Sequence, residues 1–167
     1  MQKNIIQVIY GVGKGKSAAA IGQSVQAVSA GKRVVFISFL KGKNMKDLEC
    51  IERLLEPDFK VFCFEKEECT YEELSEEQKE EEKQNIMNGF HFANKVVETG
   101  DCDLLVLDEV LGLVDLGILT IQDIYRLIEK CGTQVSLIMT GKYISKELLQ
   151  HIDEVSEINC IKTISAD

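Results

Sequence analysis

The sequence predicts an α/β fold with a mostly parallel sheet of about six strands and helices on both faces. Short apolar segments rich in β-branched residues alternate with longer amphipathic segments along the 167 residues. That alternation is typical of parallel strands joined by helical crossovers. Apolar residues make up 45% of the chain, which is normal for a globular domain of this length. Since no internal repeat or flexible linker interrupts the pattern, we expect a single domain over residues 1–167.

Six segments have the short, β-branched character of buried strands. The first, NIIQVIY, ends at a glycine, and the fourth, LLVL, is apolar at every position. Continuous apolar runs of this kind fit strands that are covered on both faces. The predicted strands are residues 4–10, 33–39, 60–64, 104–107, 134–140 and 155–163.

Five segments between the strands have helical spacing of apolar residues or a capping signal. Asn44 is a candidate N-cap for the second helix, and Pro57 follows the end of that helix. Ser75 and Gln78 have the capping-box spacing, so the longest helix begins there. The predicted helices are residues 16–30, 44–55, 75–99, 120–130 and 145–151.

The charge of the chain is concentrated in one segment. The formal net charge is −9, and residues 65–82 hold ten Glu and two Lys, a net of −8. We interpret this segment as a solvated face and helix start. General affinity for nucleic acid or anionic lipid needs clustered Lys and Arg, so we expect neither nucleic acid nor a membrane as a partner.

The cysteines and the apolar runs predict a cytoplasmic protein. None of the six cysteines forms a C-x-x-C pair, which argues against zinc ribbons and thioredoxin-like sites. No signal peptide precedes the first predicted strand, and no apolar run reaches the ~18 residues of a membrane span. Six reduced thiols in the cytoplasm are the simplest interpretation.

The segment G-V-G-K-G-K-S, between the first predicted strand and helix, indicates a phosphate-binding loop. Glycines let the backbone curl so that N–H groups point at phosphate oxygens, and the helix N-terminus adds its positive dipole end. We expect Lys14 and Lys16 to neutralise phosphate charge and Ser17 to offer its hydroxyl to Mg²⁺. The alternative is a glycine turn without a ligand. The residues predicted to contact the nucleotide, ATP or a close relative, are Gly11, Val12, Gly13, Lys14, Gly15, Lys16, Ser17 and Ala18.

This loop departs from the common pattern G-x-x-x-x-G-K-[ST]. Tyr10 stands where the pattern has its first glycine, and Gly11 comes one residue too late. The loop is therefore a shortened or shifted variant, with an additional cation at Lys14.

Polar residues follow two further strands. Asp108 and Glu109 come directly after LLVL, and Thr140 ends the next strand. Ligands of open α/β sheets gather at the carboxyl ends of the strands, so we expect Ser17, Asp108 and Glu109 to hold Mg²⁺. Glu109 is either a second metal contact or a base that activates water; the alternative for the pair is a solvated acidic turn. Thr140 either senses the phosphate chain or belongs to a helix-capping turn.

Four runs of the chain together closely resemble the corrinoid adenosyltransferases that use a P-loop. The runs are G-V-G-K-G-K-S-A-A-A-I-G, V-V-F-I-S-F-L-K-G, G-D-C-D-L-L-V-L-D-E and L-I-M-T-G-K. The resemblance extends from about Ile5 to Lys162, and the shortened loop with its extra lysine is its specific part. It favours the three-layer P-loop NTPase (RecA-like) fold.

The resemblance implies a reaction. Cobalt(I) of a reduced corrinoid attacks the 5′ carbon of ATP, triphosphate leaves and a cobalt–carbon bond forms. The phosphate chain would lie reversed in the loop, so that the ribose carbon is at the reacting end. Lys14, Lys16 and Glu109 are the candidate catalytic residues, with Mg²⁺ as cofactor. An electron donor such as a flavodoxin and a homodimer are candidate partners.

Several positions differ from the family pattern. Ser38 replaces a Gln, Gln26 replaces an Arg, and the family's Phe and Trp correspond to Cys69 and Tyr71. Those aromatics are thought to displace the lower ligand of the corrinoid, and the acidic segment around them could order as a lid. The alternatives are another P-loop phosphohydrolase or kinase, and a nucleotide-binding regulatory protein that has lost catalysis, which the residues at Cys69 and Tyr71 favour.

Overall fold

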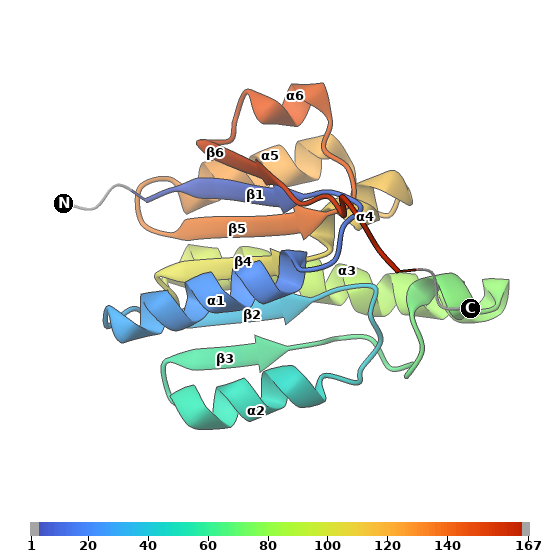
Figure 1. Ribbon diagram of the computed structural model, residues 1–167, viewed down its shortest axis with the longest axis horizontal. Coiled ribbons are helices and arrows are strands. Elements are labelled where there is room, and N and C mark those ends of the chain that lie inside the picture. The colour runs from blue at the N-terminus through green and yellow to red at the C-terminus, as the bar shows by residue number, and fades with distance from the viewer. Residues whose placement is uncertain (1–3, 165–167) are drawn as a thin grey trace.

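The computed structural model describes residues 4–164, and in them six parallel strands form one sheet in the order β3-β2-β4-β5-β1-β6 (Figure 1). The chain order and the parallel pairing confirm the predicted α/β fold. One strand, β5, separates the strand before the phosphate loop, β1, from the strand that ends at Asp108, β4. The strands are β1 (Ile6–Tyr10), β2 (Val34–Ser38), β3 (Phe59–Phe62), β4 (Leu104–Asp108), β5 (Ser136–Gly141) and β6 (Glu154–Glu157).

Helices cover both faces of this sheet, which gives a three-layer α/β fold. One apolar cluster joins one face to α1 and α2, and a larger cluster joins the other face to α3, α4 and α5. A 3₁₀ turn, Tyr71–Glu73, precedes α3. The helices are α1 (Lys16–Ser29), α2 (Lys46–Leu55), α3 (Glu76–Thr99), α4 (Val110–Asp115), α5 (Ile121–Cys131) and α6 (Lys146–Leu149).

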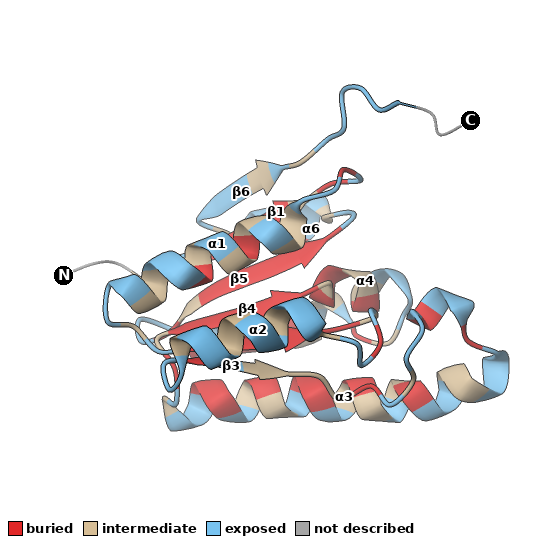
Figure 2. Ribbon diagram, turned by 60° about the horizontal axis from the view of Figure 1, so that its bottom comes forward, coloured by how far each residue is buried: buried red, intermediate tan, exposed pale blue. Residues whose placement is uncertain are grey.

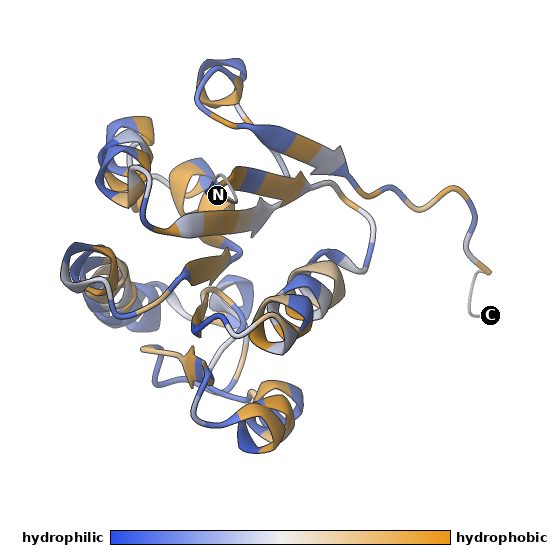
Figure 3. Cartoon of the chain, turned by 90° about the vertical axis from the view of Figure 1, so that its left-hand side faces the viewer, coloured by the Kyte–Doolittle hydropathy of each residue, from blue (hydrophilic) through white to orange (hydrophobic). Residues whose placement is uncertain are grey.

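The central strands are apolar because both of their faces are covered. Every residue of β2 and β4 is buried, whereas the edge strand β6 is mostly exposed (Figure 2). In Figure 3 the central strands are predominantly hydrophobic, whereas β6 is not, and the helices around them show mixed hydrophobic and hydrophilic faces. Within residues 4–164, no helix has both the length and the apolar character that crossing a bilayer requires.

Three element predictions need correction. Helix α4 was not predicted, because its six residues are too few to show a helical period, although its apolar side chains are buried. The N-cap of α2 is Met45 and not Asn44, and no side chain caps that end. Strand β6 ends at Glu157 rather than near Thr163, since the chain then turns to pass over the phosphate loop.

The interpretation of residues 65–82 as a solvated face is wrong at its two ends. Glu65 is only 7% exposed and Glu82 only 2%. Both carboxylates accept backbone hydrogen bonds, which offset part of the cost of burying a charge. The Glu residues between them are mainly exposed, and the capping box of Ser75 and Gln78 begins α3 as predicted.

Candidate active site

The sheet places the candidate residues together because its strands are parallel. Their carboxyl ends meet at one edge, where β1 leads into the phosphate loop, β2 into residues 39–43, β4 into Asp108 and β5 into Gly141. Since β5 lies between β1 and β4, its last residues lie between the phosphate loop and Asp108. The candidate site is therefore built from four separate strand ends.

Asp108 is the centre of this cluster. It is only 1% exposed, and its carboxylate accepts a hydrogen bond from Ser17 Oγ at 2.9 Å and one from Thr140 Oγ1 at 2.7 Å. Lys41 Nζ lies 2.6 Å from the same carboxylate and also contacts Ser17 Oγ. Two hydroxyl donors and one ammonium thus offset the cost of burying this side chain. The structure thus brings the predicted pair Ser17 and Asp108 into direct contact.

Lys41 is a site residue that the sequence did not single out. Its backbone follows β2, and its side chain is 40% exposed with the ammonium directed at Asp108. The only signal for it was the L-K-G of the second run in the family resemblance, where it carried no assigned role. A lysine after a strand is common, so its place in the site depends on the tertiary arrangement.

The donor set around Asp108 fits Mg²⁺. Mg²⁺ prefers hard oxygen ligands and is held by one or two carboxylates together with water and substrate phosphates. Ser17 Oγ and the Asp108 carboxylate supply such oxygens side by side, and the Lys41 ammonium beside them shows that a cation is accommodated there. Glu109 follows Asp108 directly in the chain and lines the adjacent cavity.

The phosphate loop has the predicted lysine and helix N-terminus. Lys16 begins α1, and its Nζ folds back to donate a hydrogen bond to the Gly13 carbonyl at 3.0 Å. Gly15, at φ 113°, takes the left-handed conformation before the helix, which favours glycine. Lys14 is exposed and makes no hydrogen bond or ion pair with residues 4–164. Lys14 is therefore accessible to an incoming anion.

Glycines of the phosphate loop also make room for another segment of the chain, which the sequence did not indicate. The Gly13 N–H donates to the Ile158 carbonyl at 3.0 Å, and the Gly11 N–H donates to the Gly141 carbonyl at 3.1 Å. A Cβ on Gly13 would lie 2.8 Å from the Ile158 oxygen. The chain after β6 passes so close to the phosphate loop that position 13 requires glycine. The Gly11 and Gly13 amides are both hydrogen-bonded within the protein.

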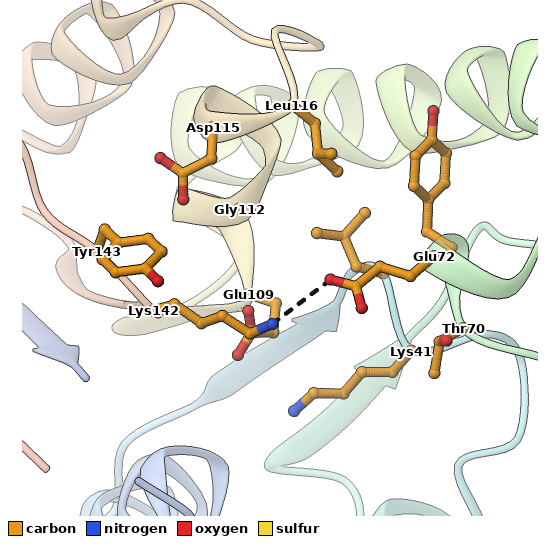
Figure 4. A pocket seen from close by; sticks show the side chains of 11 residues that line it. Lys41, Thr70, Glu72, Glu109, Gly112, Asp115, Leu116, Lys142 and Tyr143 are labelled. Carbon is orange, nitrogen blue, oxygen red and sulfur yellow. Dashed lines mark hydrogen bonds and ion pairs between the residues drawn. The ribbon is translucent and has the colours of Figure 1, made fainter. Parts of the chain in front are cut away.

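Glu109 lies beside a cavity of about 400 Å³ (Figure 4). Its φ of 63° is unusual for a residue other than glycine, and its N–H donates to Thr140 Oγ1 at 2.8 Å. Burial and then Asp108 raise the pKa of Glu109, against the effect of Lys41 and other lysines. Lys142 crosses the same cavity to pair with Glu72 at 3.4 Å. The cavity is therefore lined by Glu109 together with Lys41 and Lys142, next to the Asp108 cluster.

The two positions that correspond to the family's aromatics are placed differently. The side chain of Tyr71 is buried at the margin of the cavity, and the backbone N–H of Tyr71 donates to the Leu40 carbonyl at 3.1 Å. Cys69 is exposed, and its carbonyl lies against Gly42, where a Cβ would be 2.6 Å away. Ser38 and Gln26 lie at the end of β2 and on α1.

Thr140 links the two acidic residues, and its hydroxyl should contribute to stability. We expect Thr140→Val to lower the free energy of unfolding by about 1–3 kcal/mol, because the buried Asp108 carboxylate loses one of its donors and the Glu109 N–H loses its acceptor. Urea unfolding of both proteins at the same pH measures the difference. Thr133→Val, at an exposed loop position, is the matched control. An unfolding curve for Thr140→Val that matches the control would contradict this assignment.

Comparison with known proteins agrees with this arrangement. The family model for the ATP:corrinoid adenosyltransferase BtuR/CobO/CobP matches residues 2–166. The corrinoid adenosyltransferase of Escherichia coli (strain K12) is 28% identical over 165 residues, covering 96% of this chain and 79% of that protein. The corrinoid adenosyltransferase CobA of Salmonella typhimurium is 28% identical with the same coverage, and that of Pseudomonas aeruginosa is 24% identical over 96% of this chain and 77% of that protein. With its family model matched over nearly its whole length, and with a phosphate loop facing a buried aspartate, this chain belongs to the ATP:corrinoid adenosyltransferase family.

Proposed function

We propose that the protein transfers the 5′-deoxyadenosyl group of ATP to cobalt(I) of a reduced corrinoid and releases triphosphate. The observation that carries this proposal is the family match over residues 2–166, together with a phosphate loop in contact with a buried aspartate. Cobalt(I) supplies the electron pair of the new cobalt–carbon bond, and the pair of the broken carbon–oxygen bond leaves with the triphosphate. The corrinoid thus carries the bond-forming chemistry.

The chain's own contribution is to bind ATP and stabilise the leaving triphosphate. Negative charge develops on the oxygen that leaves, and fixed cations near it lower the barrier. Lys16 and Lys14 lie on the phosphate loop, and Lys41 lies across from it beside Ser17. Amides from Lys14 to Ala18 at the start of α1 add the positive end of the helix dipole. Mg²⁺ bound at Ser17 and Asp108 would add further neutralising charge.

No proton leaves the reacting carbon, so the transfer needs no general base. We therefore propose that Glu109 is a metal contact, and its position next to Asp108 supports this. The cavity beside it is within the size range of small-ligand pockets. We propose that the adenosyl end of ATP points toward this cavity and that the corrinoid lies over its mouth.

The products distinguish this function from phosphate hydrolysis. We expect phosphorus NMR of an anaerobic mixture of ATP, Mg²⁺ and pre-reduced cob(I)alamin to show triphosphate in step with a light-labile cobalt–carbon product. The attack is on carbon, so all three phosphates leave together. A reaction without corrinoid is the control and should leave ATP intact. ADP and phosphate, formed whether or not corrinoid is present, would instead indicate a phosphohydrolase.

A further inference from the structure

We propose that Glu65 is the positioning residue that holds Lys41 in the nucleotide site, an inference that rests on the function proposed above. Glu65 lies beyond β3, and its carboxylate makes no hydrogen bond to the phosphate loop in the part of the chain that the structure describes. Its carboxylate instead binds the backbone on either side of Lys41. The Leu40 N–H donates to Glu65 Oε2 at 3.0 Å, and the Gly42 N–H donates to Glu65 Oε1 at 3.2 Å. Both oxygens of one buried side chain therefore fix a three-residue segment.

The backbone at this segment needs such support. Leu40 has a φ of 66°, a left-handed conformation that an apolar branched residue seldom adopts and that costs of order 1–3 kcal/mol. Gly42 is also left-handed, at 73°. The two turned residues flank Lys41 and send its side chain back toward Ser17 and Asp108. Glu65 supplies the acceptors that keep both N–H groups in this arrangement.

The surroundings of Glu65 disfavour its charged form. Burial raises its pKa to about 7, with a further rise from Glu82 and an opposing effect of the Gly42 and Leu40 amides. The titratable groups facing it are Glu82 on α3 and the Cys63 thiol after β3. Since the native state holds a proton that the unfolded state releases, stability falls as pH rises from about 4.5 to about 7. The carboxylate form therefore predominates only above about pH 7.

Only the charged form can hold both amides fully. A protonated carboxyl keeps one good acceptor, since its other oxygen carries hydrogen. Glutamine has the same shape and also offers one acceptor, while its NH₂ group would face an amide donor. Above pH 7 the carboxylate therefore fixes Lys41, and below that pH the segment loosens. Glu65→Gln should fold, because it removes a buried charge without changing volume.

The test is the affinity for Mg·ATP, measured by calorimetry at pH 6 and pH 8. The proteins are wild type, Glu65→Gln, Lys41→Met and the double variant. We expect Lys41→Met to weaken binding about 10-fold at pH 8, as for one charge-assisted hydrogen bond. Glu65→Gln should weaken it about 5- to 10-fold at pH 8 and hardly at all at pH 6. Dividing the affinity of each variant by the wild-type affinity at the same pH removes the effect of the protonation of ATP itself. The double variant should match Lys41→Met, because Glu65 acts only through Lys41.

Glu82→Gln is the matched control. It is also a buried glutamate, but its carboxylate accepts from Lys66 N and from Asn85 and not from the Lys41 segment. Removing its charge should keep affinity at pH 8 and move the pH dependence of binding to lower pH. The proposal would be overturned if Glu65→Gln bound Mg·ATP as tightly as the wild type at both pH values. It would also be overturned if the losses in binding free energy of Glu65→Gln and Lys41→Met added fully in the double variant, or if Lys41→Met left the affinity unchanged. ATP binding without adenosylated corrinoid would instead refute only the proposed reaction.

Discussion

Lys16→Ala is expected to weaken ATP binding by about 10- to 150-fold. A hydrogen bond to a charged group is worth ~1.5–3 kcal/mol, and ~1.4 kcal/mol corresponds to a factor of ten in affinity. In the structure the Lys16 ammonium already lies over the phosphate loop, bound to the Gly13 carbonyl at 3.0 Å. It can exchange that single neutral partner for phosphate oxygens without a change in the fold. Calorimetry with Mg·ATP on the folded variant measures the loss.

Two further variants make the Lys16 result specific. Lys95→Ala, at an exposed position near the end of α3, removes the same charge elsewhere and should leave affinity unchanged. Lys14→Ala should weaken binding by a smaller factor, because its exposed ammonium is screened by solvent. Equal affinity of Lys16→Ala and Lys95→Ala would reject the phosphate-loop assignment.

Asp108→Asn is expected to raise the Mg²⁺ concentration for half-maximal adenosyl transfer at least about 10-fold and to lower the rate at fixed Mg²⁺ by about 100-fold. Asparagine can still accept from Thr140, but it removes a metal-binding charge and leaves Lys41 without its counter-ion at 2.6 Å. Rates measured across a Mg²⁺ titration separate the two effects. Ser17→Ala should raise the Mg²⁺ requirement less, since it removes a neutral ligand.

The other end of the same strand provides a control for the Asp108 variant. Asp103 precedes β4 and pairs with Arg33, so Asp103→Asn removes a carboxylate at the opposite edge of the sheet. Its Mg²⁺ requirement should equal that of the wild type. Adenosyl transfer that continues at full rate in excess chelator would show that Asp108 holds no metal.

The sequence predicted those parts of the site that local chemistry determines. Lys16 and Ser17 were identifiable because glycine, lysine and serine in that order after a strand have few other uses. Asp108 was identifiable because it ends a strand that is apolar throughout, and parallel strands bring their ends to one edge. These signals lie within one element or follow from the chain order alone.

The missed features depend on contacts between distant segments. Lys41 looked like any lysine after a strand, and its role follows from the turned backbone at Leu40. Glu65 lies in a segment of many acidic residues, and nothing in that run indicates that it is buried while its neighbours are exposed. The contact of Ile158 with Gly13 is made by backbone atoms, so it has no side-chain signature.

The position of β1 in the sheet has a consequence for biosynthesis. Its two neighbours are β5 and β6, both made near the end of the described chain, and the phosphate loop also pairs with Ile158. Such long-range pairing slows folding, because a large loop must close before the contacts form. On the ribosome β1 must wait, unpaired in its native register, until β5 and β6 have emerged. ATP stabilises only a state that binds it, so the nucleotide can protect the finished protein but not the growing chain.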